Sequence, residues 1–531
     1  MIIIGLHASF ALGTHDPGVS LVINGEVKAI YEEERFNRIK LSRGHFPLYS
    51  LKALLKDFNL SMEQVSFIAT TGATSPWLEE KVRSVLVRTF GCAPRIRKIH
   101  HQYAHMWCAL LSGCPEETNF ICVDAFGDGK SGIYGRRTTK GIESRFINKR
   151  ESLGNFYAIG TSLLGFTAGE DEYKVMGLAA YGDNTKAMDE KKEYLFELFD
   201  SDKNFEHILS VRNNYESFHV DSLEKEAHNI YGDINKDFAA RAELAYDIQR
   251  VFEAKLFSLV DQCAREYPTQ TDSIALAGGC ALNCQANLKL SELGYEVFVS
   301  PVSSDRGLAL GSALALTNEL GIKIKPLEGI CYGQDILNEN VNEELRNNGL
   351  EKRAVPFDAE IIAEKLVNGA IIGLCSGRSE AGARALGRRS IIADPSITGM
   401  KDKLNKKIKY REAFRPFAPA VLDEDGSRYF LNYKTSRFMT QNFRGSDQAI
   451  RDIPECIHSN GTARVQSVVK SDGKLYEILK QIKKIRGAGI LINTSFNLKG
   501  QPIVQTERDA LGTFHQCGID ELIIGDYVLS K

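Results

Sequence analysis

Short apolar runs separated by polar turns open the chain. Residues 2–6 form one apolar run, and residues 19–23 and 26–31 are rich in β-formers on either side of Asn24-Gly25. An Asn-Gly pair between two apolar runs is a strong signal for a β-hairpin. The pattern therefore predicts a strand, a loop and a hairpin at the start of the chain.

Further along, apolar positions alternate between helical and strand spacing. Residues 47–58 repeat with the period of an amphipathic helix, and a long stretch rich in Ala, Leu, Glu and Arg predicts another helix. The predicted helices are 47–58, 238–266 and 307–320, and the predicted strands are 67–70, 119–123 and 273–277. Strands that alternate with helices favour an α/β fold.

The pattern is interrupted at residues 322–350. This stretch contains Pro326, several glycines and polar runs, and it reads as a connection. After it, the sequence predicts a helix from about residue 354, strands at 370–374 and 489–492, and a last strand at 521–528. We therefore expect two domains, residues 1–345 and 346–531, and we find no internal repeat and no low-complexity tract.

Composition narrows the class of protein. The 531 residues carry 66 Lys and Arg against 68 Asp and Glu, so the net charge of -2 does not favour bulk attraction to nucleic acid or an anionic membrane. No apolar run approaches the ~18 residues of a membrane span, and the first residues lack the basic start of a signal peptide. The eleven cysteines are odd in number and show no repeated C-x-x-C spacing. We expect a reduced cytoplasmic enzyme.

Three predicted strands run into turns that contain Gly and Asp. The turns are His-Asp-Pro-Gly at 15–18, Asp-Ala-Phe-Gly-Asp-Gly at 124–129 and Ala-Gly-Gly-Cys-Ala-Leu-Asn at 277–283. Glycine allows backbone N–H groups to approach a phosphate. Any one of these turns reads equally well as an ordinary turn. Their order along the chain resembles the actin-like ATPase and sugar-kinase superfamily, in which two hairpins grip phosphates and a Gly-Gly turn cradles the nucleoside.

Two histidines and two aspartates form a candidate metal site. His101 and His105 are four residues apart and share one face of a helix, whereas Asp124 ends a buried strand and Asp305 precedes a predicted helix. Mixed imidazole and carboxylate ligands suit Fe(II), Mn(II) or Zn(II) better than Mg or Ca alone. Two alternatives remain open: a His pair at this spacing is often solvated or buried without a metal, and Asp305 also suits a helix N-cap. There is no Glu at position 102, so the H-E-x-x-H pattern is absent.

The second predicted domain begins with a glycine-spaced arginine loop at residues 376–390. Guanidinium groups bind phosphate through two parallel hydrogen bonds, and lysine adds point charge. The cations that follow the loop are Lys401, Lys403, Lys406, Lys407, Lys409, Arg411 and Arg415. We interpret this region, with the polar strand end at 491–497, as a pocket for a small phosphate or a nucleotide. Lys403 and Lys406 also suit a solvated helix face, and the interleaved aromatic residues leave an RNA-binding patch as an alternative.

Taken together, these motifs resemble the O-carbamoyltransferases of the NodU/CmcH family. The matching stretches are residues 15–16, 32–40, the histidines at 101 and 105, and residues 169–182, 278–283, 382–390, 414–419, 461–466 and 493–497. They occur in order from near the start of the chain to near its end.

The resemblance implies a fold and a reaction. The first domain would be actin-like and similar to the metal-binding subunit that transfers threonylcarbamoyl to tRNA, and the second would be an α/β domain of the YrdC type. The second domain would join ATP and carbamoyl phosphate to give carbamoyl-adenylate and pyrophosphate. The first domain would then move the carbamoyl group onto a substrate hydroxyl and release AMP.

The resemblance also implies site residues and partners. The metal would be Fe(II), or another divalent transition metal, on His101, His105, Asp124 and Asp305, and ATP with Mg²⁺ would be the cosubstrate. His15 suits a general base by its ordinary pKa of about 6.5, although it also suits a turn residue bonded to Asp16. The implied catalytic residues are His15, Asp16 and Lys40. The implied substrate and nucleotide residues are Glu172, Lys174, Gly278, Gly279, Asn283, Arg384, Lys409, Arg415, Ser495 and Asn497.

The chain departs from the family pattern in several places, among them Arg306 after Asp305 and Ala383 before Arg384. The expected partners are carbamoyl phosphate, ATP and a hydroxyl-bearing small molecule such as a natural product or a sugar, with no membrane, nucleic acid disfavoured and an oligomer left open. Two other functions compete. A small-molecule kinase or ATPase on the first domain leaves the Arg384 loop without a role, and a tRNA-modification partner would bind RNA through the basic stretch. The sequence does not identify the acceptor.

Overall fold

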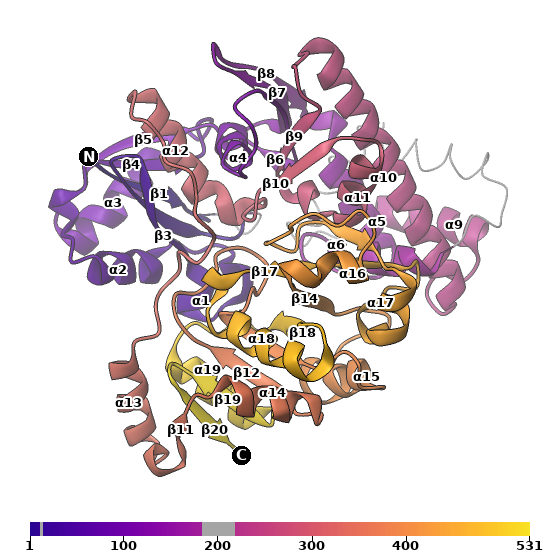
Figure 1. Ribbon diagram of the computed structural model, residues 1–531. Helices are drawn as coiled ribbons and strands as arrows, with labels where there is room; N and C mark the ends of the chain where they lie inside the picture. The colour runs from indigo at the N-terminus through magenta and orange to yellow at the C-terminus, as the bar shows by residue number, and fades with distance from the viewer. Residues whose placement is uncertain (11–13, 183–217) are drawn as a thin grey trace. The chain divides into compact units, whose positions relative to one another are not determined.

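The computed structural model describes residues 1–10, 14–182 and 218–531 (Figure 1). The chain forms two compact units. Unit 1 contains Met1–Ile30 and Ser42–Glu328, and unit 2 contains Tyr31–Leu41 and Gly329–Lys531. Across the described ranges, every helix is too short or too polar to cross a membrane.

The division between the units differs from the predicted boundary at 345/346 in two respects. The chain enters unit 2 at Gly329, because the stretch that reads as a connection contains helix α13 (Asn338–Asn347). Two buried residues one helical turn apart, Val341 and Leu345, anchor this otherwise polar helix in the core of unit 2. In addition, the early segment Tyr31–Leu41 groups with the C-terminal half of the chain.

Unit 1 contains two five-stranded sheets with the same strand order. The first has the order β3-β2-β1-β4-β5, and the second has the order β8-β7-β6-β9-β10. In the first sheet the central strand β1 pairs antiparallel with β2 and parallel with β4. In the second sheet the central strand β6 pairs antiparallel with β7 and parallel with β9. The strands are β1 (Ile2–His7), β2 (Gly18–Ile23), β3 (Glu26–Glu32), β4 (Phe67–Thr71), β5 (Arg95–Ile99), β6 (Thr118–Gly127), β7 (Lys130–Thr138), β8 (Gly141–Asn148), β9 (Ser273–Ala277) and β10 (Glu296–Val299).

This repeated topology is that of an actin-like domain. The sequence shows no repeat, because a fold of this kind constrains the apolar pattern of each strand and not the identity of each residue. Local predictions are confirmed: Asn24 and Gly25 adopt φ values of 49° and 79° in the hairpin turn. The predicted helix 238–266 matches α10 (Phe238–Glu266), and the predicted strand 273–277 matches β9.

Helices separate and cover the two sheets of unit 1. Helix α12 (Leu308–Glu319) contacts the first sheet and also helix α4 (His101–Leu110), which in turn contacts the second sheet (Figure 1). In the described residues of unit 1, the other α-helices of more than five residues are α2 (Leu48–Asp57), α3 (Leu78–Phe90), α5 (Leu153–Leu163), α6 (Glu172–Leu178), α9 (Phe218–Tyr231), α10 and α11 (Cys284–Glu292).

Helix α12 is apolar on all sides and is buried from Leu308 to Thr317. Glycines allow its close approach to its neighbours. A Cβ added at Gly311 would lie 2.0 Å from the carbonyl oxygen of Ala104 in α4, and a Cβ added at Gly5 in β1 would lie 1.8 Å from the carbonyl oxygen of Ala309. The backbones of the two helices therefore touch where any larger residue would separate them.

Unit 2 is built on an eight-stranded mixed sheet of order β11-β20-β19-β12-β13-β18-β14-β17. The strands are β11 (Val355–Pro356), β12 (Ile372–Cys375), β13 (Arg389–Ala393), β14 (Ala418–Leu422), β17 (Gln466–Val468), β18 (Ile490–Ser495), β19 (Glu521–Ile524) and β20 (Tyr527–Ser530). A separate two-stranded sheet pairs β15 (Asn442–Arg444) with β16 (Thr462–Arg464). The mixed α/β sheet, together with the actin-like first unit, is the architecture that the sequence predicts, with a YrdC-like second domain.

Both faces of the large sheet are buried under helices. Neighbouring residues of one strand enter different cores, as Ile391 and Ile392 do in β13. Helices α14 (Ala359–Val367) and α18 (Lys474–Arg486) cover one face. The other core includes residues of α13, α15 (Met400–Leu404), α16 (Gly426–Tyr429), α17 (Asp447–Asp452) and α19 (Glu507–Gln516).

The predicted final strand at 521–528 is wrong in one respect. The structure has two strands there, β19 and β20, which pair with each other around Gly525 and Asp526. Gly525 has a φ of 53°, which favours glycine and reverses the chain. The apolar residues on both sides of this short turn give the appearance of one continuous run.

We predict that Gly311→Ala destabilises unit 1. Its methyl group has no space beside Ala104, so α12 and α4 must move apart, at a cost of about 1–3 kcal/mol. The free energy of unfolding measured in urea tests this.

The matched control for Gly311→Ala is Gly512→Ala in the interior of α19. No atom lies within 4 Å of the added Cβ at this position, so we expect unchanged or slightly higher stability. Equal stability of the Gly311→Ala variant and the wild type would contradict the close approach.

Candidate functional site

The two histidines of the predicted metal site lie on one helix, as the sequence predicts. Helix α4 begins at His101, and both His101 and His105 are buried, with exposed fractions of 7% and 0%. The carboxylate of Asp128 accepts a hydrogen bond from the His101 backbone N–H at 2.8 Å and another from Ala73 N–H at 3.0 Å. The turn after β6 therefore fixes the start of α4.

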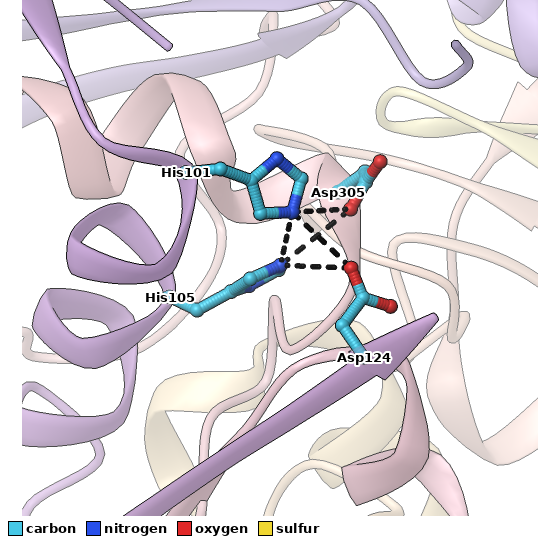
Figure 2. Close-up of side chains that lie close together, drawn as sticks. All are labelled: His101, His105, Asp124 and Asp305. Atoms are coloured by element: carbon cyan, nitrogen blue, oxygen red, sulfur yellow. Dashed lines mark hydrogen bonds and ion pairs between the residues drawn. The ribbon is translucent and has the colours of Figure 1, made fainter. Parts of the chain in front are cut away.

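Asp124 approaches the histidines from strand β6. The pairing register of β6 with β7 shifts between Val123 and Gly127, and Asp124 lies inside this irregularity. Its Oδ2 atom lies 3.2 Å from His101 Nε2 and 3.3 Å from His105 Nε2 (Figure 2). Its Oδ1 atom accepts a hydrogen bond from Gly279 N–H at 3.4 Å, which connects the cluster to the Gly-Gly turn.

Asp305 completes the cluster from the start of a short 3-10 helix ahead of α12. Its Oδ1 atom lies 3.6 Å from His101 Nε2 and 3.5 Å from His105 Nε2. The N-cap of this 3-10 helix is Ser304 and the N-cap of α12 is Gly307, so Asp305 occupies neither cap position. The choice between N-cap and cluster member, which the sequence left open, is therefore decided by geometry in favour of the cluster.

The cluster fits a metal ion. One ligand atom from each of the four residues lies within 4.8 Å of the others, and the closest pair, the two Nε2 atoms, is 3.1 Å apart. Ligands at about 2.1 Å from a common ion lie about 3.0–3.4 Å from one another at octahedral or tetrahedral angles. Two imidazoles and two carboxylates suit a first-row transition metal.

The electrostatics of the cluster agree with this fit. Burial disfavours a charged imidazole, but the hydrogen bonds to Asp124 and Asp305 outweigh it and raise the pKa of His105 to about 9. Two half-buried carboxylates beside the buried His105 ring therefore favour its protonated form when no cation is bound. A bound cation would supply this charge in place of the proton.

His15 and Asp16 lie beside the same cluster. His15 Nδ1 is 3.1 Å from Asp16 Oδ2 and 3.9 Å from Asp305 Oδ2. Burial lowers the pKa of His15, but the bond to Asp16 and the charge of Asp305 outweigh it and raise the pKa above its usual value. Arg306, which departs from the family pattern, lies 3.4 Å from Asp16 Oδ1. Its charge outweighs burial and, with His15, lowers the pKa of Asp16 to about 2.

His7 supports this arrangement from β1. Its Nε2 atom lies 3.0 Å from the carbonyl oxygen of His15, and its Nδ1 atom lies 2.6 Å from the hydroxyl of Thr71. Burial lowers the pKa of His7 to about 4, so the ring is neutral and can donate through Nε2 and accept through Nδ1. Sequence reasoning did not select His7, because its role depends on a contact with β4.

The other predicted residues of unit 1 take differing positions. Gly278 has a φ of 83°, and a Cβ there would lie 2.2 Å from the carbonyl oxygen of Val123. The Asn283 side chain accepts from Ala286 N–H at 3.1 Å as the N-cap of α11. Glu172 accepts from Gly169 N–H, and burial raises its pKa. Lys174 pairs with Asp171 at 3.0 Å.

A buried polar network beside the Gly-Gly turn was missed by sequence reasoning. Gln249 of α10 exchanges hydrogen bonds of 2.9 and 3.0 Å with the Asn283 amide, accepts from Tyr157 at 2.8 Å and donates to Glu253 at 2.8 Å. Gln249 and Glu253 are polar residues four apart on the buried face of a helix, and this pattern was the available signal.

In unit 2, the structure brings Lys409 to the end of β18. Residues Asn405–Lys409 form a π-helical turn, and Tyr410 follows with a φ of 46°. π-Helical turns frequently occur at functional sites. Lys409 Nζ donates to Asn497 Oδ1 at 2.9 Å, Asn497 O at 3.1 Å and Ser495 Oγ at 3.3 Å. Burial and the nearby Arg411 and Arg415 hold the pKa of Lys409 well below its usual value.

The arginine loop divides into structural and candidate binding residues. Arg389 is fully buried and donates to the carbonyl oxygens of Gln505 at 3.1 Å and Gly377 at 3.0 Å. Arg378 likewise donates to backbone carbonyls. These two guanidinium groups bind backbone carbonyls and so hold the loop in place, which leaves Arg384 as the arginine of the loop in the predicted binding set. Arg384 is half-buried, and its neighbour Ala385 accepts from the Asn493 side chain in β18 at 3.1 Å.

Lys40, a predicted catalytic residue, belongs to unit 2 and not to the unit that contains the metal cluster. It is exposed and belongs to the segment Tyr31–Leu41, which groups with unit 2. Arg415 lies in unit 2 with Lys409 and pairs with Glu412 at 3.5 Å.

Comparison with known proteins agrees with these two units. A family model described as the carbamoyltransferase N-terminus matches residues 52–314, and one described as the carbamoyltransferase C-terminus matches residues 363–531. An uncharacterized protein of Methanocaldococcus jannaschii is 32% identical over 97% of this chain and 98% of its own length.

Two further relatives carry functional names. The nodulation protein NolNO of Sinorhizobium fredii is 32% identical over 97% of this chain and 79% of its own length. The 3'-hydroxymethylcephem-O-carbamoyltransferase of Streptomyces clavuligerus is 28% identical over 67% of this chain and 64% of its own length.

Proposed function

Because the chain belongs to the NodU/CmcH family of carbamoyltransferases, we propose that it divides an ATP-dependent O-carbamoylation between its two units. In unit 2, ATP, carbamoyl phosphate and water give carbamoyl-adenylate, pyrophosphate and phosphate. In unit 1, a hydroxyl of a small-molecule acceptor attacks the carbamoyl carbon, and the products are a carbamate ester, AMP and a proton. The cluster of His101, His105, Asp124 and Asp305 beside His15, in which both histidines are buried, is the observation that carries the assignment of the transfer step.

His15 suits the role of general base in the transfer. Asp16 holds the Nδ1 side of the ring at 3.1 Å, which leaves Nε2 as the atom that takes the proton from the acceptor hydroxyl. The same carboxylate stabilises the imidazolium that results, since an anion next to the ring favours its charged form. Arg306 keeps Asp16 ionised throughout.

His101, His105, Asp124 and Asp305 would hold Fe(II) or another divalent transition metal. When bound, such an ion acts as a Lewis acid for a carbonyl or phosphoryl oxygen. Asp124 also accepts from Gly279 N–H, so the same residue would orient the Gly-Gly turn. We assign this turn to nucleotide binding, together with the other predicted nucleotide residues of unit 1, which are Gly278, Asn283, Glu172 and Lys174.

Adenylate formation requires neutralised phosphate charge. We assign this role in unit 2 to Arg384, Lys409 and Arg415, with Ser495 and Asn497 beside Lys409. A cation in a desolvated pocket stabilises a developing negative charge more strongly than it would in water. ATP with Mg²⁺ would be the cosubstrate, and a kinase confined to unit 1 would leave this second set of cations without a substrate.

We predict that pyrophosphate release from ATP requires carbamoyl phosphate and falls at least about tenfold in Arg384→Ala, because one charge-assisted phosphate contact is worth about 1.5–3 kcal/mol. A coupled pyrophosphate assay with and without carbamoyl phosphate measures this.

Arg508→Ala serves as the control for Arg384→Ala. Arg508 is 80% exposed and pairs with Glu344 on the surface of unit 2, so its loss should leave pyrophosphate release unchanged. ATP turnover without carbamoyl phosphate would favour a kinase or an ATPase. Normal pyrophosphate release by Arg384→Ala would remove Arg384 from the adenylation site.

We also predict that anaerobically purified protein contains about one transition-metal ion per chain, and that His105→Ala and Asp305→Ala each lose it, since each removes one of four ligands. Elemental analysis of the purified proteins is the measurement. His515→Ala, an exposed histidine in α19, should retain the metal. A metal-free wild type with full transfer activity would refute the metal assignment, and retention of the ion by Asp305→Ala would remove that residue from the ligand set.

A further inference from the structure

The segment Tyr31–Leu41 carries charged residues to which no role has been assigned. It includes the run Glu32-Glu33-Glu34-Arg35, and these four side chains are 5%, 1%, 4% and 2% exposed. Charged side chains are rarely buried unless they are paired. Glu32 ends β3, and the other three lie in α1 (Glu33–Asn37), a helix of only five residues, so their burial requires a structural reason.

Glu32 and Arg35 together bind the backbone of one residue in unit 2. Glu32 Oε1 accepts a hydrogen bond from Gly382 N–H, and Arg35 Nη2 donates to the carbonyl oxygen of Gly382 at 3.1 Å. The two side chains also pair with each other, with Arg35 Nε 3.3 Å from Glu32 Oε2. Both polar backbone groups of Gly382 are thus held by a single buried ion pair.

Gly382 lies two residues before Arg384. It has a φ of 97°, which turns the chain within the 376–390 loop. On the other side of Arg384, the Asn493 side chain holds Ala385, and Gln466 donates to the carbonyl oxygen of Leu386 at 2.9 Å. The ion pair therefore fixes one end of a short stretch whose other end is fixed by β17 and β18.

Arg38, further along the same segment, holds a second loop. It donates to the carbonyl oxygens of Ile503 at 2.6 Å and Pro502 at 3.0 Å. This loop follows Asn497, whose side chain donates to the carbonyl oxygen of Gln501 at 2.7 Å. The loop that carries Arg384 and the loop that follows Asn497 are thus both held by side chains from the N-terminal part of the chain.

We propose that Glu32 and Arg35 are positioning residues for adenylate formation, which hold the turn at Gly382 so that Arg384 meets the phosphate. The inference rests on the proposed function, since it assigns a role within that reaction. Both residues act through the backbone of Gly382. The segment Tyr31–Leu41 therefore contributes to adenylate formation in unit 2.

The test compares Glu32→Gln and Arg35→Lys with the wild type in the pyrophosphate assay, with ATP and carbamoyl phosphate titrated separately. Glu32→Gln keeps an acceptor for Gly382 N–H but removes the charge beside Arg35, and Arg35→Lys keeps the charge but removes the forked geometry. We expect KM for the substrate whose phosphate contacts Arg384 to rise about tenfold with little change in kcat, because binding is weakened while the fold persists. Amide hydrogen exchange over residues 378–389 should be faster in both variants.

Arg508→Gln is the control, because it breaks an exposed ion pair of unit 2 at Glu344 that touches neither loop. A fall in apparent kcat at unchanged KM would overturn the inference, since a smaller folded fraction alone gives that result. Kinetics and exchange equal to those of Arg508→Gln would overturn it as well.

A further variant distinguishes a local effect on the Arg384 loop from general misfolding of the first two variants. Arg38→Gln removes the bonds to Pro502 and Ile503, the ion pair with Asp509 at 3.5 Å and a long bond to the Arg35 carbonyl oxygen at 3.5 Å. It leaves the Glu32–Arg35 pair in place, so it should speed exchange over residues 497–505 and leave residues 378–389 unchanged. If wild-type protein releases no carbamoyl-dependent pyrophosphate, the proposed function fails, and the exchange data on Arg35→Lys still decide whether the ion pair holds the loop. Unchanged exchange over residues 378–389 in that variant would contradict the inference.

Discussion

The direct contact between helices α12 and α4 is the constraint on which the candidate active site depends. Gly311 brings the backbone of α12 against Ala104, and a Cβ at Gly307 would lie 3.0 Å from Cys108 Sγ. Helix α4 carries His101 and His105, and Asp305 lies immediately before α12. Separations of 3.5 and 3.6 Å between the histidines and Asp305 are available only because no side chain separates the two helices at these points.

Features encoded by neighbouring residues could be predicted from the sequence. The hairpin at Asn24-Gly25, the helix Phe238–Glu266 and the shared helix face of His101 and His105 each follow from a local pattern. Features that depend on distant partners could not be predicted. The sequence named Asp305 as a candidate ligand but left an N-cap open, because the choice depends on α4. The burial of Arg389 depends on Gln505, and the place of Tyr31–Leu41 in unit 2 depends on Gly382. Helix α13 could not be predicted because its sequence is polar apart from the two buried residues Val341 and Leu345.

The candidate site residues also divide into those that a local motif identifies and those that depend on distant partners. The sequence supplied the metal cluster and the cations of unit 2 through motifs, but it did not distinguish the structural arginines of the 376–390 loop from the candidate binding residue Arg384. In the structure Arg378 and Arg389 donate to carbonyl oxygens. A buried guanidinium that satisfies several carbonyl groups stabilises a loop without binding a ligand. The supporting residues His7, Gln249 and Glu253 have no motif, because each is defined by what packs against it.

The central claim is that the two units carry separate half-reactions. Carbamoyl-adenylate formed by unit 2 can be trapped with hydroxylamine as hydroxyurea, so its formation can be measured without knowledge of the acceptor. We expect His101→Ala, which damages only the cluster of unit 1, to form the trapped product from ATP and carbamoyl phosphate at a rate close to that of the wild type. Loss of the trapped product in a folded His101→Ala protein would contradict the account, because it would show that the cluster takes part in adenylate formation itself.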